Sequence, residues 1–400
     1  MADTRQRRRQ QEEARLGRGE RREEPGVWRR MRLWGLAHAV DDLYQGLVPA
    51  VVPFFVLERG YGYVAAGGLT LAATLGSAVP QPFIGLAVDR LRLGWLAAAG
   101  LALAGAGLGL SGLAGPYGLV WLLVLLSGLG VAMFHPAAGK AAREAAGDST
   151  TAMSVFAAGG SVGFFLAPVL ATPALAAWGV RATVLFVPPA LLASWALVRN
   201  RHHQRALAAA RAAAVPSGAD RWAPFLVLTA VEVARSVVFF GVSTFVELYW
   251  LRDLGASRGL AGTALACFLG GGVAGTLGGG RLADRIGAVH TVRLGTALGL
   301  PALTGLCLAP GPYLPLLFAA ATGVVLNLPF AVLVKLGQDY LPTRPGTAAG
   351  VTLGLAVSIG GLAAPALGLV ANGYGPQGVL VALCAVPPVG LLLARFLAEP

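Results

Sequence analysis

The chain has 400 residues, of which 56% are hydrophobic and only 12% charged, whereas ordinary soluble domains carry about 25% charged residues. This balance excludes a typical soluble protein. The formal net charge of +12 does not by itself indicate a nucleic-acid partner, because the placement of the basic residues has to be compared with a membrane topology first. The three cysteines, Cys267, Cys307 and Cys384, lie in apolar stretches without metal-ligand spacing, so we interpret them as small core residues.

Twelve apolar stretches follow one another along the chain, each near the roughly 20 residues that cross a hydrocarbon layer of ~30 Å. They cover about residues 32–57, 64–88, 93–114, 117–138, 149–176, 180–198, 222–250, 259–280, 291–309, 312–334, 346–371 and 376–397. The pattern predicts an all-α integral membrane protein with twelve transmembrane helices. We expect a basic and acidic cytoplasmic tail over 1–30, a six-helix half over 31–198, a cytoplasmic linker over 199–221, and a second six-helix half over 222–398.

The basic residues are distributed unequally between the loops on the two sides of this topology. With the N-terminus inside, 26 of the 31 Lys and Arg residues lie on the inner side. Four lie on the outer side: Arg59, Arg181, Arg252 and Arg258. Because Lys and Arg accumulate in cytoplasmic loops, we expect a multi-pass protein of the inner (plasma) membrane, surrounded by lipid, with both termini in the cytoplasm and no nucleic-acid partner. The linker pair His202-His203 could bind metal, but such exposed histidines are usually solvated.

A Gly-x-x-x-Asp-Arg pattern occurs twice, at the end of an apolar stretch each time. It consists first of Gly85, Asp89 and Arg90 and then, 195 residues later, of Gly280, Asp284 and Arg285. The chain's two lysines, Lys140 and Lys335, are separated by the same 195 residues. A single offset therefore aligns the two halves as pseudo-symmetric repeats, an arrangement typical of carriers that hold a substrate between the halves.

The second copy, Gly280-Arg-Leu-Ala-Asp284-Arg285-Ile-Gly287, resembles the cytoplasmic loop signature of the major facilitator superfamily. The first copy is similar, with Leu91-Arg92-Leu93-Gly94 where an immediate glycine is expected. Finer similarity lies in His38 with Asp41-Asp42, Gln81-Pro82, Phe134-His135-Pro136 and Ala234-Arg235-Ser236. Together these residues resemble the fosmidomycin-resistance-like branch of drug exporters, over roughly residues 30–395.

The resemblance implies the major facilitator fold and proton-coupled efflux, an antiport of small amphipathic or anionic compounds by alternating access. The proton gradient would supply the energy, and no cofactor is expected. It also implies that both Gly-x-x-x-Asp-Arg motifs and His135 belong to a cytoplasmic gate. The fifth stretch contains Ala167-Pro168 where antiporters often carry Gly-Pro, so a proton symporter that imports a small metabolite remains the alternative.

Ionisable residues inside membrane spans are costly, and each is a functional hypothesis by default. At ~1.5 Å per residue from Arg32, His38 lies about 9 Å and Asp41 about 13 Å into the first span. His38 shares a helix face with Asp41 and Asp42, and Gln45 lies one turn beyond Asp41. We expect Asp41 or Asp42 to carry a proton together with His38, and His38 and Gln45 to contact substrate. The alternative is that an aspartate only balances His38.

The seventh span carries Glu232 and Arg235, three residues apart. They can pair with each other or face the cluster of the first span. Arg235 is our candidate for an anionic substrate group, since its planar fork can bind phosphonate or carboxylate at two points; Glu232 is a further candidate for proton coupling. A purely structural ion pair is the alternative.

His135 is expected near the inner end of the fourth span, where a gating or helix-end role is favoured over proton transfer. Asp89 and Asp284 lie at span ends, where a carboxylate can meet the positive N-terminus of a neighbouring helix. By resemblance, they hold the two halves together on the cytoplasmic side.

An enzyme is not expected, because no serine, cysteine or metal-ligand set stands beside the histidine and aspartates of the first span. A receptor is not expected either, since the chain lacks a sizeable hydrophilic domain. The sequence thus predicts a secondary transporter for protons and a small molecule, without catalytic or metal-binding residues, that functions as a monomer.

Overall fold

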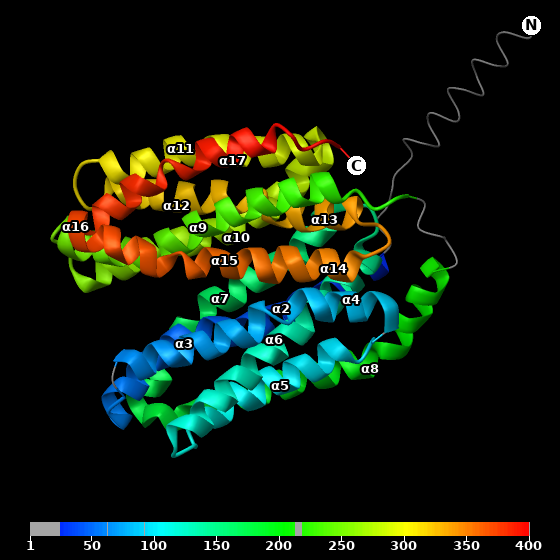
Figure 1. The fold of residues 1–400 in the computed structure, drawn as a ribbon, viewed down its shortest axis with the longest axis horizontal. Coiled ribbons are helices and arrows are strands. Elements are labelled where there is room, and N and C mark those ends of the chain that lie inside the picture. Colours follow the sequence, from blue (N-terminus) through cyan, green and yellow to red (C-terminus); the bar gives the residue numbers. More distant parts are fainter. Residues whose placement is uncertain (1–24, 62, 92, 213–217, 400) are drawn as a thin grey trace, which may run out of the picture.

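The computed structural model describes residues 25–61, 63–91, 93–212 and 218–399, and its regular structure there is helical throughout. This follows from the composition, because a chain in hydrocarbon has to pair its backbone N–H and C=O groups internally, as helices do. Two bundles lie one above the other in Figure 1. Most of the predicted tail, residues 1–24, lies outside the described residues.

The first bundle contains α2 (Pro25–Arg59), α3 (Tyr63–Ala78), α4 (Gln81–Leu91), α5 (Leu96–Ser111), α6 (Tyr117–Ala146), α7 (Thr150–Trp178), the 3₁₀ helix η1 (Gly179–Phe186) and α8 (Val187–Ala212). The second contains α9 (Trp222–Arg252), α10 (Arg258–Ile286), α11 (Ala288–Leu308), α12 (Leu314–Asn327), α13 (Phe330–Tyr340), α14 (Pro345–Ala349), the π-helical η2 (Gly350–Leu355), α15 (Ala356–Leu362), α16 (Ala364–Leu383) and α17 (Val386–Ala394).

Within the described ranges, nine helical stretches are long and apolar enough to cross a membrane. The stretch Thr150–Asn200 has 51 residues, about 76 Å of helix, and it supplies two crossings because the chain reverses at η1. The shorter apolar helices Leu96–Ser111 and Pro345–Gly360 supply two more. The described chain therefore makes twelve crossings, six in each bundle.

Two details differ from the expected spans. Helix α16 continues through Gly375, whose φ of +72° marks the turn between the last two crossings. Helix α8 continues to Ala212, so residues 199–212 of the predicted linker extend the last helix of the first half. Residues 213–217 are not described, and Arg221 then donates its backbone N–H to the Tyr340 carbonyl of the second half.

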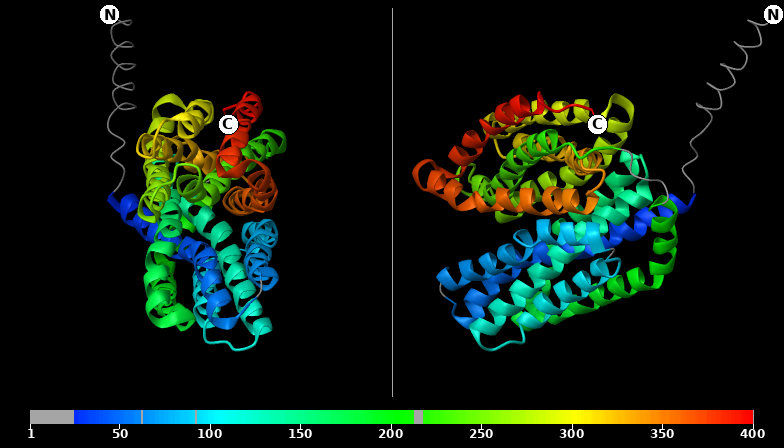
Figure 2. Two further views of the ribbon diagram at one scale, coloured as in Figure 1. Left: turned by 90° about the vertical axis from the view of Figure 1, so that its left-hand side faces the viewer. Right: turned by 45° about the vertical axis from the view of Figure 1, so that its right-hand side comes forward.

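The two bundles share a hydrophobic core at one end. There, Val88 and Ala142 of the first half pack in one cluster with Val334, Ala349 and Leu353 of the second half. Helix α7 lies against α10 and α13, and α14 lies against α4 and α6, an arrangement that the two views of Figure 2 make visible. The molecule is closed at this end, which the charge distribution predicts to be cytoplasmic.

Candidate functional site

The ionisable residues of α2 meet a histidine from α6 inside the first half. His38 Nε2 lies 3.4 Å from Asp42 Oδ2, and His135 Nε2 lies 3.1 Å from Asp42 Oδ1. His135 Nε2 is also 3.7 Å from Asp41 Oδ2. His38, Asp41 and His135 are buried, while the Asp42 side chain keeps 16% of its surface exposed. We call these four residues the His–Asp cluster.

Helix α7 fixes the orientation of His38. The His38 ring stacks on Phe156 with centroids 4.3 Å apart, and His38 Nδ1 lies 2.8 Å from the Phe156 carbonyl oxygen. A carbonyl only accepts hydrogen bonds, so Nδ1 must carry the proton. Gly160 lets the α7 backbone approach, because a Cβ there would lie 2.3 Å from Asp42 Oδ2 and 2.7 Å from His38 Nε2.

The His–Asp cluster contains more hydrogen-bond acceptors than donors. With Nδ1–H donated to Phe156, a neutral His38 presents an unprotonated Nε2 to Asp42. His135 Nε2 is the atom within reach of both aspartates, and it has one proton to donate. Among the described residues, both Asp41 carboxylate oxygens and His38 Nε2 are buried without a hydrogen-bond partner. The arrangement can therefore accept protons, or another cation, from outside.

The expected placement of His135 near the end of its helix is wrong. The apolar stretch was expected to end at residue 138, but α6 continues to Ala146, so eleven residues of the helix follow His135 and add about 16 Å. His135 consequently lies at the depth of Asp42 on α2. Gln45 is half-buried one turn beyond Asp41, and the contacts that hold the cluster do not include it.

A second charged group, the ion pair of Glu232 and Arg235, lies in the second half. Arg235 Nε donates to Glu232 Oε2 at 2.9 Å and its Nη2 donates to Glu232 Oε1 at 2.6 Å. The third nitrogen, Nη1, lies 3.4 Å from Asn327 Oδ1, and the guanidinium lies 4.6 Å from the centre of the Phe330 ring. Of the two alternatives, the structure shows the pair, and the contacts of Glu232 and Arg235 with other described residues lie within the second half.

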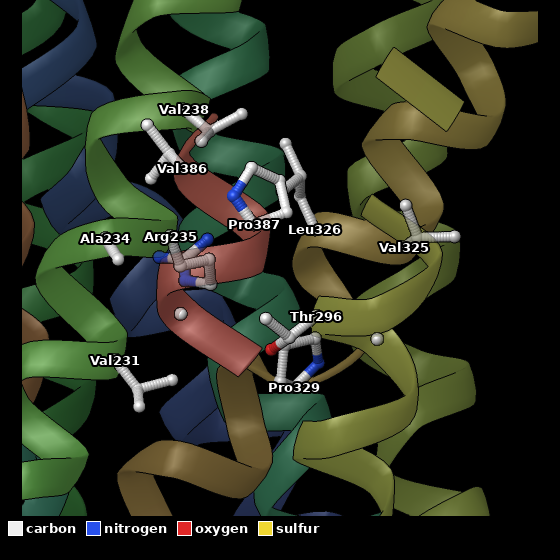
Figure 3. A pocket seen from close by; sticks show the side chains of 12 residues that line it. Val231, Ala234, Arg235, Val238, Thr296, Val325, Leu326, Pro329, Val386 and Pro387 are labelled. Carbon is white, nitrogen blue, oxygen red and sulfur yellow. The ribbon is translucent and has the colours of Figure 1, made fainter. Parts of the chain in front are cut away.

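Arg235 also contributes to the lining of a small pocket in the second half. The pocket lies between α9, α11, α12 and α17, and Figure 3 shows Arg235 there with Thr296, Pro329 and Pro387. The remaining lining is largely apolar, for example Val238. Arg235 is the cationic side chain in this mostly apolar lining.

The two charged groups lie close to one another in the repeat, although the offset of 195 pairs Arg235 with Val40 and Asp42 with Val237. Phe330 follows His135 by 195 residues, so the residue that covers Arg235 is the counterpart of the residue that contacts Asp42. In each half, a charged residue of the first crossing contacts an aromatic ring of the fourth crossing, and the two rings are related by the offset of 195. The sequence did not identify Phe330 and Asn327, although the offset of 195 could have pointed to Phe330.

At the closed end, both motif aspartates bind the N-terminus of a helix from the opposite half. Asp89 Oδ1 and Oδ2 accept the backbone N–H groups of Gly346 and Thr347 in α14, each at 2.8 Å. Asp284 accepts those of Thr150 and Thr151 in α7, each at 2.9 Å. An ionised carboxylate stabilises the positive end of a helix, so each contact ties the halves together.

The motif glycines allow these contacts, since each lies one helical turn before its aspartate. A Cβ on Gly85 would lie 2.6 Å from the Gly346 carbonyl oxygen, and one on Gly280 would lie 2.6 Å from Ser154 Oγ. The motif arginines, Arg90 and Arg285, are exposed. The sequence did not predict the ion pair between Arg143 Nη2 and Asp339 Oδ1 across the same interface, at 2.6 Å.

Replacing Asp89 or Asp284 with asparagine is expected to open this end of the molecule. Each lost carboxylate charge at a helix N-terminus should cost about 1 kcal/mol, about fivefold in the population of the closed state. Spin labels at Gly94→Cys and Ile286→Cys, in a protein without its native cysteines, would report a longer distance by double electron–electron resonance. Asp253→Asn, which changes an exposed aspartate at the opposite end of the molecule, is the control; unchanged distances in both motif variants would contradict the expectation.

The comparisons with known proteins agree with this geometry. Residues 35–365 match the Major Facilitator Superfamily. The fosmidomycin resistance protein of Escherichia coli (strain K12) is 29% identical over 381 residues, which cover 91% of each chain. YfnC of Bacillus subtilis (strain 168), an uncharacterized MFS-type transporter, is 28% identical over 375 residues, 90% of each chain.

Solved structures show the same fold. The fucose:proton symporter FucP in its outward conformation superposes with a TM-score of 0.72 at 14% identity, covering 92% of this chain and 99% of FucP. A variant of the E. coli FucP gives 0.71 at 14% identity, covering 94% and 100%. The predicted fold class and the family resemblance are confirmed. The chain belongs to the Major Facilitator Superfamily and is a multi-pass integral membrane transporter.

Proposed function

We propose that the chain is a proton-coupled exporter, an antiporter that moves small amphipathic or anionic compounds out of the cell by alternating access. The His–Asp cluster carries this proposal, because its acceptors outnumber its donors at a buried position on the first crossing. The relative that is named for fosmidomycin resistance supports the outward direction. Asp41 and Asp42 would bind the transported proton with His38, His135 would connect the two carboxylates, and the proton gradient would replace any cofactor.

Substrate would bind between the halves and reach Arg235. Glu232 accepts from two of the guanidinium nitrogens, and Nη1, which donates to Asn327 at 3.4 Å, would be the nitrogen offered to a ligand. Glu232 stays a candidate for proton coupling only if Arg235 releases it during the cycle. His38 and Gln45 are proposed to contact the substrate from the first half.

The closed end would be the cytoplasmic one, with both termini on that side of the inner membrane. The described conformation would then be outward-facing. Asp89 and Asp284 with Gly85 and Gly280 would form the gate that opens toward the cytoplasm. The transporter is proposed to work as a monomer in lipid, since the charged groups of both halves are formed by side chains of one and the same chain.

Transport in proteoliposomes under a pH gradient tests the proposal. With labelled fosmidomycin as the probe, an acidic lumen is expected to drive accumulation in the lumen, because protons leave as substrate enters. A protonophore should abolish this accumulation. Accumulation driven instead by an alkaline lumen would show the symport alternative, and no response to either gradient would refute proton coupling of this probe.

A further inference from the structure

We propose that His38, His135 and Asp42, with Asp41 beside them, form a binding site for a divalent first-row transition metal ion of the Zn²⁺ type. The proposal uses the side chains of the proposed proton site, but it depends on their geometry and not on proton coupling. No metal site is expected from the sequence, because His135 is 93 positions from Asp42 and no short ligand motif joins them.

The distances between the ligand atoms resemble those of a coordination sphere. One ligand atom each from His38, Asp42 and His135 lies within 4.8 Å of the others. Ligand atoms about 2.0–2.2 Å from Zn²⁺ stand about 3.4 Å apart in a tetrahedron. His38 Nε2 lies 3.4 Å from Asp42 Oδ2, and His135 Nε2 lies 3.1 Å from the other oxygen of Asp42 and 3.7 Å from Asp41 Oδ2. The imidazole nitrogens of His38 and His135 would have to move closer together to bind the same ion. Asp41 would supply the fourth ligand.

The tautomer of His38 is already the one that a metal ion requires, whereas His135 would have to move its proton from Nε2, where Asp42 accepts it, to Nδ1. Metal-binding histidines usually donate their other ring N–H to a carbonyl or carboxylate, which fixes the ring. His38 Nδ1 does this with the Phe156 carbonyl at 2.8 Å, and the stacked Phe156 ring restrains the plane of the imidazole. The unprotonated Nε2 therefore points at Asp42 with no hydrogen-bond partner.

The charge of the cluster also fits a dication. Asp41 and Asp42 are carboxylates in a buried site, and in the described part of the chain the basic side chains paired with them are His38 and His135. Two ionised carboxylates without a cation would be costly to bury. One divalent ion would neutralise both, and two imidazole nitrogens with carboxylate oxygens favour Zn²⁺, Co²⁺ or Ni²⁺ over Mg²⁺ or Ca²⁺. Asp42, with 16% of its side chain exposed, provides the way in.

Cobalt binding to the purified transporter tests this site, because tetrahedral Co²⁺ absorbs visible light much more strongly than octahedral Co²⁺. The full chain would be purified through a streptavidin-binding tag, and His202→Ala with His203→Ala would remove the histidine pair of the linker. We expect one equivalent of Co²⁺ to give a tetrahedral spectrum that Zn²⁺ abolishes by displacement. Zn²⁺ should also raise the melting temperature of this protein.

Substitutions of the ligands locate the ion. His38→Gln and His135→Gln are each expected to weaken Co²⁺ binding at least tenfold and to remove the effect of Zn²⁺ on melting. His290→Gln, which changes a histidine on α11 outside the cluster, should leave both unchanged. Asp42→Asn keeps the shape of the side chain, so a weaker cobalt spectrum in this variant cannot be attributed to misfolding when its melting temperature without metal matches the parent.

An octahedral spectrum, or cobalt binding that survives both histidine substitutions, would overturn the proposal. So would binding that disappears with the His202 and His203 substitutions alone. These measurements need neither substrate nor a gradient, so their failure would leave the proton-coupled transport intact, and a failure of gradient-driven transport would leave the metal site intact.

Discussion

Asp41→Asn and Asp42→Asn are each expected to abolish gradient-driven transport while leaving exchange of labelled for unlabelled substrate partly intact. Asparagine is nearly isosteric with aspartate and keeps an oxygen that accepts a hydrogen bond, so His135 can still donate to position 42. It cannot bind and release a proton. Exchange involves no net proton movement and therefore does not require that step.

The measurement compares two assays on the same proteoliposomes. Uphill accumulation of the probe under an acidic lumen should fall to the level of empty liposomes in either variant, whereas exchange at equal pH should continue at a reduced rate. Asp253→Asn is the matched control, because it removes an exposed carboxylate at the end opposite the closed one and should retain both activities. If both single variants still accumulate probe against a gradient, the proton binds elsewhere, and Glu232 is the next residue to substitute.

Much of the fold could be predicted from the sequence, because hydrophobic length and internal repetition act along the chain. The offset of 195 residues that relates Gly85 to Gly280 also relates Thr150, where α7 begins, to Pro345, where α14 begins. These are the two helix starts that the motif aspartates cap. The reversal at η1 and the turn at Gly375 were also close to the expected boundaries, because apolar runs end where the chain leaves the hydrocarbon.

The candidate site could be predicted only within single helices. The shared face of His38 and Asp42 follows from their spacing of four, and the pair of Glu232 and Arg235 from their spacing of three. The contact with His135 could not be predicted, because it depends on how far α6 continues beyond its apolar stretch. Contacts between helices depend on such depths, which hydropathy alone places with an error of several residues.

Arg235→Lys is expected to weaken the binding of an anionic probe at least tenfold, even though the charge is kept. Arg235 now uses two nitrogens on Glu232 and keeps Nη1 near Asn327. A lysine ammonium that paired with Glu232 would have no second nitrogen on a rigid planar group with which to bind a ligand at the same time. A hydrogen bond to a charged group contributes about 1.5–3 kcal/mol, and 1.4 kcal/mol corresponds to a factor of ten in affinity.

The double variant Glu232→Gln with Arg235→Gln separates this role from a purely structural one. Removing both members of a buried ion pair is often tolerated, whereas removing one leaves an uncompensated charge. We therefore expect the double variant to melt near the parent temperature, and Glu232→Gln or Arg235→Gln alone to melt lower. If Arg235 binds substrate, the double variant will fold well and still bind the anionic probe poorly. Near-normal affinity in that well-folded double variant would remove Arg235 from the binding site and leave it as the structural partner of Glu232.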